Sequence, residues 1–209
     1  MKLLLVGSTG LVGRHLLALA LAHPGVETVV APVRRPASAQ PKLLAPLVDF
    51  EALPADAAWW RVDAAICTLG TTMRVAGSRE AFRRVDHDYP LAVAKLARRH
   101  QVPTFVLNSA VGADPNSLFF YNRVKGELER DLGELGFRSL TLVRPGLIGG
   151  QREEHRGGER AALLALGLMG PLLPRAWRIN PAQRIAQALL DAALASAPGA
   201  HVVSSDRLI

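Results

Sequence analysis

Cysteine is nearly missing from this 209-residue chain, which has a single one, Cys67. No disulfide can therefore form within the chain. Cys67 lies in the apolar stretch DAAICTLG with no other cysteine nearby, and we expect a buried, unreactive thiol rather than a nucleophile or a metal ligand. The sequence offers no other metal-ligand spacing, so we expect no metal. A lone cysteine fits a reducing compartment, and we expect a cytoplasmic protein.

Long hydrophobic runs are also absent. The apolar start, Leu3 to Val6, is shorter than the hydrophobic part of a signal peptide, and glycines follow it at once. The segment 161–173, AALLALGLMGPLL, is too short to span a bilayer and contains two glycines and a proline. We therefore expect a soluble protein that has no membrane partner.

Lysine is scarce, although the formal net charge is +7. Only four lysines occur, so the basic character comes mainly from arginine, and the arginines are scattered along the chain rather than gathered in a stripe. A dense stripe is what nucleic-acid binding usually requires, so we expect no nucleic-acid partner. A small anionic ligand accounts for the charge at least as well, and salt-dependent retention of DNA or RNA would indicate otherwise.

Short apolar strands separated by helices make up most of the chain. This alternation is typical of a parallel sheet covered by helices on both faces. We predict a single α/β domain over residues 1–209, with a Rossmann-type, doubly wound sheet. Pro46 places the third strand near an edge or a bend. The predicted strands are 2–6, 26–33, 42–50, 62–70, 103–110, 138–146 and 200–205. One helix is predicted directly after GSTGLVG, in the stretch RHLLALALA, and the others cover 86–100, 118–134, 157–170 and 181–196.

A glycine-rich loop joins the first strand to the first helix. Its glycines have the spacing GxxGxxG, which suits a tight turn, a close approach of a pyrophosphate to the backbone and close packing of the helix on the sheet. The helix N-terminus would then face the phosphates. We predict a dinucleotide-binding loop rather than a merely structural turn. Its residues are Gly7, Ser8, Thr9, Gly10, Leu11, Val12 and Gly13.

The end of the second strand indicates which dinucleotide is bound. NAD sites usually have an acidic residue there for the ribose 2′-hydroxyl, whereas this chain has Arg34 and Arg35. Two guanidinium groups suit a 2′-phosphate, so we expect NADP(H) to be preferred, with NAD(H) possible; a solvated charge pair is the alternative. Asp49 and Phe50, at the end of the third strand, are candidates to hold the adenine, although Asp49 equally suits a turn.

A serine, a tyrosine and a lysine follow the fifth strand in the stretch SAVGADPNSLFFYNRVKGE. Ser109 ends the strand, and Tyr121 and Lys125 lie one helical turn apart on the next helix. Together with GSTGLVG, FVLNSAVGAD and LVRPGLIGG, this set resembles the short-chain dehydrogenase/reductase (SDR) superfamily over nearly the whole chain. The resemblance is greatest to its atypical members, the NmrA-like and Tat-interacting-protein-like NAD(P)H-binding oxidoreductases.

The resemblance implies a role for each of these residues. Tyr121 would be the acid–base, Lys125 its partner and a ligand of the nicotinamide ribose, and Ser109 the group that orients the substrate carbonyl. A nearby ammonium favours phenolate, which brings a phenol towards the working pH range. The alternative is a surface tyrosine–lysine pair without chemistry.

Two further loops would pass beside the cofactor. The first, Leu69, Gly70 and Thr71, would flank its ribose and diphosphate, and the second, Pro145, Gly146, Leu147 and Ile148, its nicotinamide. The NAG sequence of classical SDRs is replaced here by LGT, so their asparagine-linked proton relay is not carried over. The segment from about 150 to 180 is all that remains for a substrate lid, and it contains several arginines.

The sequence thus predicts an NADP(H)-dependent oxidoreductase that acts on a small carbonyl, an alcohol or a sugar-nucleotide-like substrate. The partner would be a small molecule, and the protein a monomer or a homodimer. A non-catalytic NADP(H)-binding redox sensor or regulatory protein is the alternative, motivated by the small substrate region.

Overall fold

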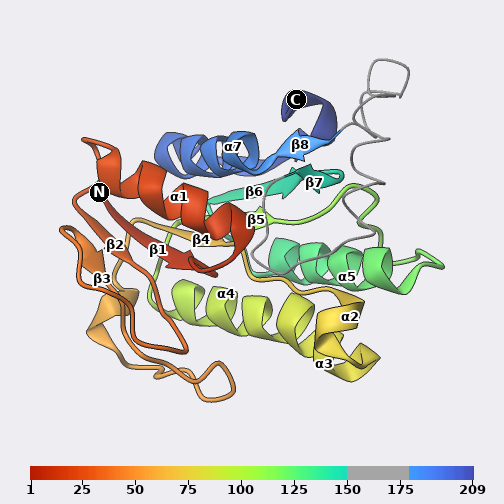
Figure 1. The fold of residues 1–209 in the computed structure, drawn as a ribbon, viewed down its shortest axis with the longest axis horizontal. Helices are drawn as coiled ribbons and strands as arrows, with labels where there is room; N and C mark the ends of the chain where they lie inside the picture. The colour runs from red at the N-terminus through yellow and green to blue at the C-terminus, as the bar shows by residue number, and fades with distance from the viewer. Residues whose placement is uncertain (150–178) are drawn as a thin grey trace.

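A seven-stranded parallel sheet forms the centre of the molecule (Figure 1). The computed structural model describes residues 1–149 and 179–209. The strand order is β3-β2-β1-β4-β5-β6-β9, and each pair of neighbours is parallel. The strands are β1 (Lys2–Val6), β2 (Thr28–Val30), β3 (Leu43–Leu44), β4 (Ala64–Cys67), β5 (Thr104–Asn108), β6 (Ser139–Arg144) and β9 (Gly199–Ser204). The predicted Rossmann-type fold is confirmed, and β3, the strand before Pro46, is an edge strand as predicted.

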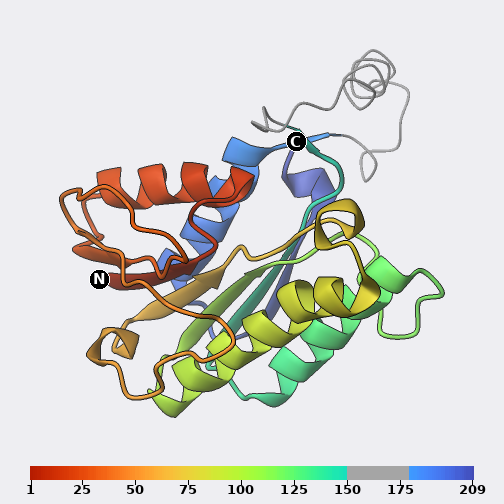
Figure 2. The same cartoon turned by 60° about the horizontal axis from the view of Figure 1, so that its bottom comes forward.

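Helices cover both faces of the sheet (Figures 1 and 2). Successive residues of β1 alternate between two cores: Leu3 and Leu5 pack with α1 and α7, whereas Leu4 and Val6 pack on the side of α4 and α5. This alternation is why β1 is a continuous apolar run. The long helices are α1 (Leu11–Ala22), α4 (Tyr89–Arg99), α5 (Phe120–Glu134) and α7 (Ala182–Ala195); the short ones are η1 (Ala58–Trp60), α2 (Met73–Ala76), α3 (Arg79–Arg83) and η5 (Ser205–Arg207).

The helix predicted over 86–100 begins earlier than the apolar pattern indicates. It starts at Arg79 as α3, continues through η2 (Arg84–Asp88), a π-helical segment, and then becomes α4. The π-helical segment buries two polar residues, Asp86 and His87, which is the reason that apolar periodicity did not reveal it. Two further short strands that were not predicted, β7 (Ile148–Gly149) and β8 (Asn180–Pro181), pair with each other, so the predicted helix 181–196 begins at Ala182.

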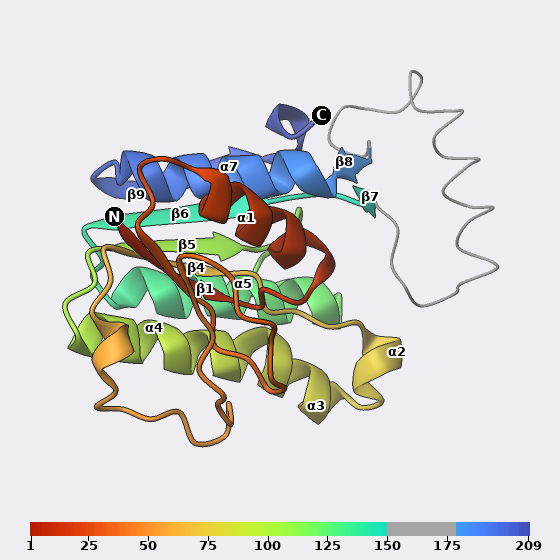
Figure 3. The ribbon, with the colours of Figure 1, turned by 60° about the vertical axis from the view of Figure 1, so that its left-hand side comes forward.

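The strand order reverses between β1 and β4, the place where a doubly wound sheet has its ligand-binding crevice. From β1 the chain moves outwards to β2 and β3, and from β4 it moves the other way, to β5 and β6. The chain therefore leaves β1 and β4 in opposite directions beyond the carboxyl ends of these two strands, which is where doubly wound sheets bind ligands. Figure 3 shows these adjacent strands between the two layers of helices.

Candidate cofactor and catalytic site

The glycine loop after β1 is fixed by close packing at two of its glycines. Gly7 has a φ of +89°, and a Cβ there would lie 2.8 Å from the backbone nitrogen of Leu69. A Cβ at Gly13 would lie 2.0 Å from the carbonyl oxygen of Gly7. Side chains at either position would thus collide with backbone, so these two glycines hold the loop against β4 and α1 against the loop.

The N-terminus of α1 presents unsatisfied N–H groups. Gly10 is the N-cap, no side chain among residues 1–149 and 179–209 caps the helix, and its first turn has no acidic residue. Thr9 and Gly10 are exposed, whereas Ser8 and Val12 are buried and Leu11 packs against the core. The arrangement fits a bound diphosphate, because free N–H groups and the positive end of the helix dipole both favour an anion.

The two arginines predicted to select the cofactor follow β2. Val33 forms a single bridge to Leu47, and Arg34 and Arg35 come directly after it. Both are exposed, and neither makes an ion pair with another residue in the described ranges. Their guanidinium groups are therefore available at the carboxyl edge of the sheet.

Asp49 and Phe50 are engaged in local structure. Asp49 Oδ1 accepts a hydrogen bond of 2.9 Å from the Glu51 N–H, which makes the turn given above as the alternative. Phe50 is buried in the core with its ring centroid 5.7 Å from that of Tyr89. The Phe50 ring leaves little surface for an adenine.

Lys125 is buried and paired with a carboxylate that sequence reasoning missed. Its side chain is 4% exposed, and Nζ lies 2.7 Å from Oδ1 of Asp86, which is 1% exposed. The other oxygen of Asp86 accepts the Thr71 N–H at 2.7 Å. Burial by itself lowers the pKa of Lys125, but the attraction of Asp86, with a smaller contribution from Tyr121, outweighs burial, so the pKa is raised above the usual lysine value.

Tyr121 lies one turn before Lys125 on α5 and is 40% exposed. Its ring packs against the buried ring of Phe82 at 5.7 Å between centroids. Tyr121 also contributes to the electrostatic environment of the Lys125 ammonium. The structure therefore brings together two of the three predicted catalytic residues.

Ser109 is buried and takes part in a different contact. Its hydroxyl donates a hydrogen bond to Glu129, and Arg144 binds both oxygens of the same carboxylate. Tyr121, Lys125 and Glu129 follow one another at intervals of four along one face of α5. That spacing is the sequence signal by which Glu129 could have been found.

The two loops predicted beside the cofactor lie at the carboxyl ends of β4 and β6. Gly70 is exposed directly above the ion pair, since a Cβ there would lie 3.3 Å from Asp86 Oδ1 and 3.8 Å from Lys125 Nζ. Asn180 accepts the Gly146 N–H at 2.6 Å and donates its own N–H to the Leu147 carbonyl at 2.8 Å. In this loop, Pro145 is buried, Gly146 and Ile148 are half-buried, and Leu147 is exposed.

One acceptor near the site lacks a partner. Asn108 Oδ1, at the end of β5 next to Ser109, is buried without a hydrogen bond to any residue of the described chain. Buried acceptors are normally satisfied, so this oxygen fits a donor from a bound molecule. It is a second observation, besides the open helix N-terminus, that agrees with a ligand in the crevice.

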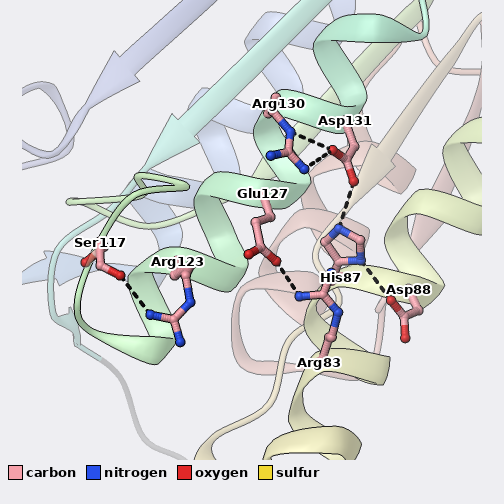
Figure 4. A network of polar contacts seen from close by, with 8 residues as sticks. All are labelled: Arg83, His87, Asp88, Ser117, Arg123, Glu127, Arg130 and Asp131. Carbon is pink, nitrogen blue, oxygen red and sulfur yellow. Dashed lines mark hydrogen bonds and ion pairs between the residues drawn. The ribbon is translucent and has the colours of Figure 1, made fainter.

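A network of polar contacts joins the helix that carries Asp86 to the helix that carries Lys125 (Figure 4). Arg83 pairs with Glu127, and His87 lies 3.0 Å from Asp131. His87 also contacts Asp88 at 2.8 Å. These contacts lie on either side of Asp86 in the sequence, so they hold α3 and η2 against α5.

Other predictions have different outcomes. Cys67 is buried, and burial raises its pKa to about 11, which keeps the thiol protonated and unreactive at neutral pH. The helix predicted over 157–170 and all but the last two residues of the lid predicted at about 150–180 lie outside the described residues. Within 1–149 and 179–209, no three potential ligands gather as a metal site. No helix in these ranges is long and apolar enough to cross a membrane.

Comparison with known proteins identifies close relatives in fungi. No protein-family model matches the chain. The mitochondrial protein fmp52 of Emericella nidulans is 39% identical over 176 residues, which cover 79% of this chain and 75% of the relative. Fmp52 proteins of other fungi match 98% of the chain at 33–34% identity.

Solved structures share the fold. MoeE5 in complex with UDP-glucose and NAD has a TM-score of 0.75 at 18% identity, over 97% of this chain and 75% of MoeE5. The human epimerase family protein SDR39U1 (isoform 2) with NADPH has a TM-score of 0.64 at 22% identity, over 98% of this chain and 74% of SDR39U1.

The relatives correct one prediction. The fungal Fmp52 proteins are named as mitochondrial, so the expectation of a cytoplasmic protein is contradicted. That expectation came from a single cysteine and the absence of an evident signal peptide. Neither feature separates the cytoplasm from another reducing compartment.

Proposed function

The chain belongs to the Fmp52 family. From this premise we propose that it is an SDR-type, NADP(H)-dependent oxidoreductase acting on a small carbonyl, alcohol or sugar-nucleotide-like substrate. The observation that carries the proposal is the buried Lys125 ammonium. It lies beneath Gly70, in the crevice that the glycine loop borders, and beside Tyr121.

Each part of the crevice has a task in this proposal. The free N–H groups at the start of α1 bind the diphosphate. When bound, the cofactor supplies or accepts a hydride. Lys125 donates hydrogen bonds to the ribose and orients Tyr121, and Tyr121 gives a proton to the substrate oxygen or takes one from it.

Ser109 has a more restricted task than the resemblance implies. A hydroxyl has one proton to donate, and that of Ser109 is directed to Glu129. In this state Ser109 accepts a hydrogen bond from a substrate hydroxyl. To donate to a substrate carbonyl it must turn away from Glu129.

The preference for NADP(H) is proposed from the two arginines. The structural neighbours contain NAD in one case and NADPH in the other, so they support a nicotinamide dinucleotide without choosing between the two. Arg34 and Arg35 are exposed at the end of the second strand, where a 2′-phosphate would lie.

Replacing Arg34 or Arg35 by alanine should weaken NADPH binding by about 10-fold or more, since a charge-assisted hydrogen bond contributes about 1.5–3 kcal/mol. NADH affinity should change by less than about threefold, because NADH has no 2′-phosphate. Calorimetry with both cofactors measures this. Arg61→Ala is the control, since Arg61 is exposed ahead of β4, at the opposite edge of the sheet. Equal affinities of the unmodified protein for NADPH and NADH would contradict the preference.

The function itself is tested by NADPH oxidation over a panel of small aldehydes, ketones and 4-keto sugar nucleotides, and by NADP⁺ reduction with the matching alcohols. Turnover of one class is the expected result. Tight NADPH binding without turnover across the panel would favour the non-catalytic sensor. If the protein binds neither NADPH nor NADH, both the oxidoreductase and the sensor hypotheses are excluded.

A further inference from the structure

The contact between Asp86 and Lys125 is the least exposed ion pair among the described residues. We propose that Asp86 is the counterion that keeps Lys125 protonated and fixed at the cofactor site, as a positioning residue for the reaction. The positioning role rests on the proposed function, whereas the ion pair of Asp86 and Lys125 does not depend on it.

The geometry holds Asp86 by both carboxylate oxygens. Oδ1 lies 2.7 Å from Lys125 Nζ, and Oδ2 accepts the backbone N–H of Thr71 at 2.7 Å. Asp86 therefore joins three elements: the π-helical segment η2, helix α5 and the loop after β4. A carboxylate that only balanced a surface charge would have no reason to bind the loop that passes beside the cofactor.

Burial makes a counterion necessary. An ammonium removed from water loses its protonated form unless an anion compensates. The groups that face Lys125 are Asp86 from η2, Tyr121 from α5 and Cys67 from β4. The pKa of Cys67 is about 11, so its thiol carries no charge at neutral pH. Asp86 supplies the carboxylate, and its attraction outweighs the effect of burial on Lys125.

The pair also limits what Lys125 can do. An ammonium has three N–H donors, and Asp86 takes one of them, which leaves two for a ribose hydroxyl and the Tyr121 oxygen. Because the adjacent carboxylate offsets its charge, Lys125 acts on Tyr121 as part of a neutral pair. Lys125 then contributes mainly by placing its N–H donors, and less through the electric field of its positive charge.

The chain allows the pair to be removed without losing the helix contact. Arg83 with Glu127 and His87 with Asp131 link the same two helices (Figure 4). We therefore expect Asp86→Asn to fold. Asp88→Asn is the matched control, because it removes the same charge from the same segment at an exposed residue that contacts His87.

The test is the ionisation of Lys125, followed by NMR of protein labelled with ¹³C-lysine. The chain has only four lysines, and Lys125→Arg identifies the Lys125 signal by its disappearance. In Asp86→Asn, Lys125 should lose its proton about two pH units lower than in the unmodified protein, while Lys2, Lys42 and Lys95 stay unchanged. In Asp88→Asn all four should titrate as in the unmodified protein. An unchanged Lys125 titration in Asp86→Asn would overturn the proposal.

A second measurement separates positioning from a merely structural contact. NADPH affinity of Asp86→Asn, measured by calorimetry, should fall about 10-fold from neutral to alkaline pH as Lys125 loses its proton, and that of Asp88→Asn should follow the unmodified protein. A flat profile in Asp86→Asn would remove the positioning role. If the unmodified protein binds no NADPH, the proposed function and the positioning role fall together, while NMR still decides the ion pair.

Asp86→Glu keeps the proposal open to contradiction if Asp86→Asn does not fold. It retains the charge but displaces the carboxylate by one methylene, so Lys125 should titrate lower than in the unmodified protein but less so than with no counterion. An unaltered titration in this variant would count against Asp86.

Discussion

Tyr121→Phe should lower the rate of NADPH-dependent carbonyl reduction by at least about 100-fold, the usual contribution of a positioned acid–base group. NADPH affinity should stay within about twofold, since the ring and its packing against Phe82 remain. Only the hydroxyl that exchanges a proton with the substrate is lost. Loss of NADPH absorbance gives the rate for whichever substrate is turned over, and calorimetry gives the affinity.

Tyr89→Phe is the matched control, because the chain has only two tyrosines. Burial and the hydrogen bond to Glu51 raise the pKa of Tyr89 to about 12, so it stays a phenol at working pH. Phenylalanine would keep its contact with Phe50, and the rate should be unchanged within about twofold. If Tyr121→Phe and Tyr89→Phe turn over equally fast, Tyr121 is not the acid–base.

Gly126→Ala should lower the free energy of unfolding by about 3 kcal/mol, at the upper end for an overpacked site. Gly126 lies next to Lys125, on the part of α5 that packs against the preceding loop. A Cβ there would lie 2.1 Å from the carbonyl carbon of Asp114 and 2.3 Å from the nitrogen of Pro115. These are backbone atoms, so α5 itself must move. Urea unfolding followed by circular dichroism measures the change.

Gly133→Ala makes the same replacement in the same helix, where a Cβ would have no neighbour within 4 Å. Alanine is the better helix former, so this variant should be more stable by about 0.5 kcal/mol. Comparable stability of the two variants would mean that α5 does not pack against the Asp114–Pro115 loop. Because α5 also carries Tyr121, Gly126→Ala should weaken turnover as well.

The fold was predictable because it depends on patterns within short stretches of sequence. Buried parallel strands are continuous apolar runs, and such runs make up most of β1, β4 and β5. Their carboxyl ends lie at one edge of the sheet, so the glycine loop, Gly70 and Ser109 were expected there. Helical spacing predicted that Tyr121 and Lys125 share one face of a helix, whereas their catalytic roles were predicted from the resemblance to the SDR superfamily.

The partners of the site residues were not predictable, because each comes from a distant segment. Asp86 lies 39 positions before Lys125, in a helical segment that buries two polar residues, Asp86 and His87. Glu129 is 20 positions from Ser109; its spacing of four from Lys125 places it on the same helix face, but does not by itself show that it binds Ser109. Phe50 was expected to meet a ligand but packs in the core, since an apolar ring at a strand end suits either place.

The π-helical segment Arg84–Asp88 makes the length of this part of the chain critical. A π-helical turn is equivalent to one extra residue inserted in an α-helix, and each residue of an α-helix turns the chain by about 100°. Deleting one residue here would keep either Phe82 against α5 or Val93 in the core, but not both. In alignments of this family, insertions and deletions should therefore fall in the loops on either side of residues 79–99. A relative that is one residue shorter within this segment would need a different residue in place of Asp86 as the partner of the lysine.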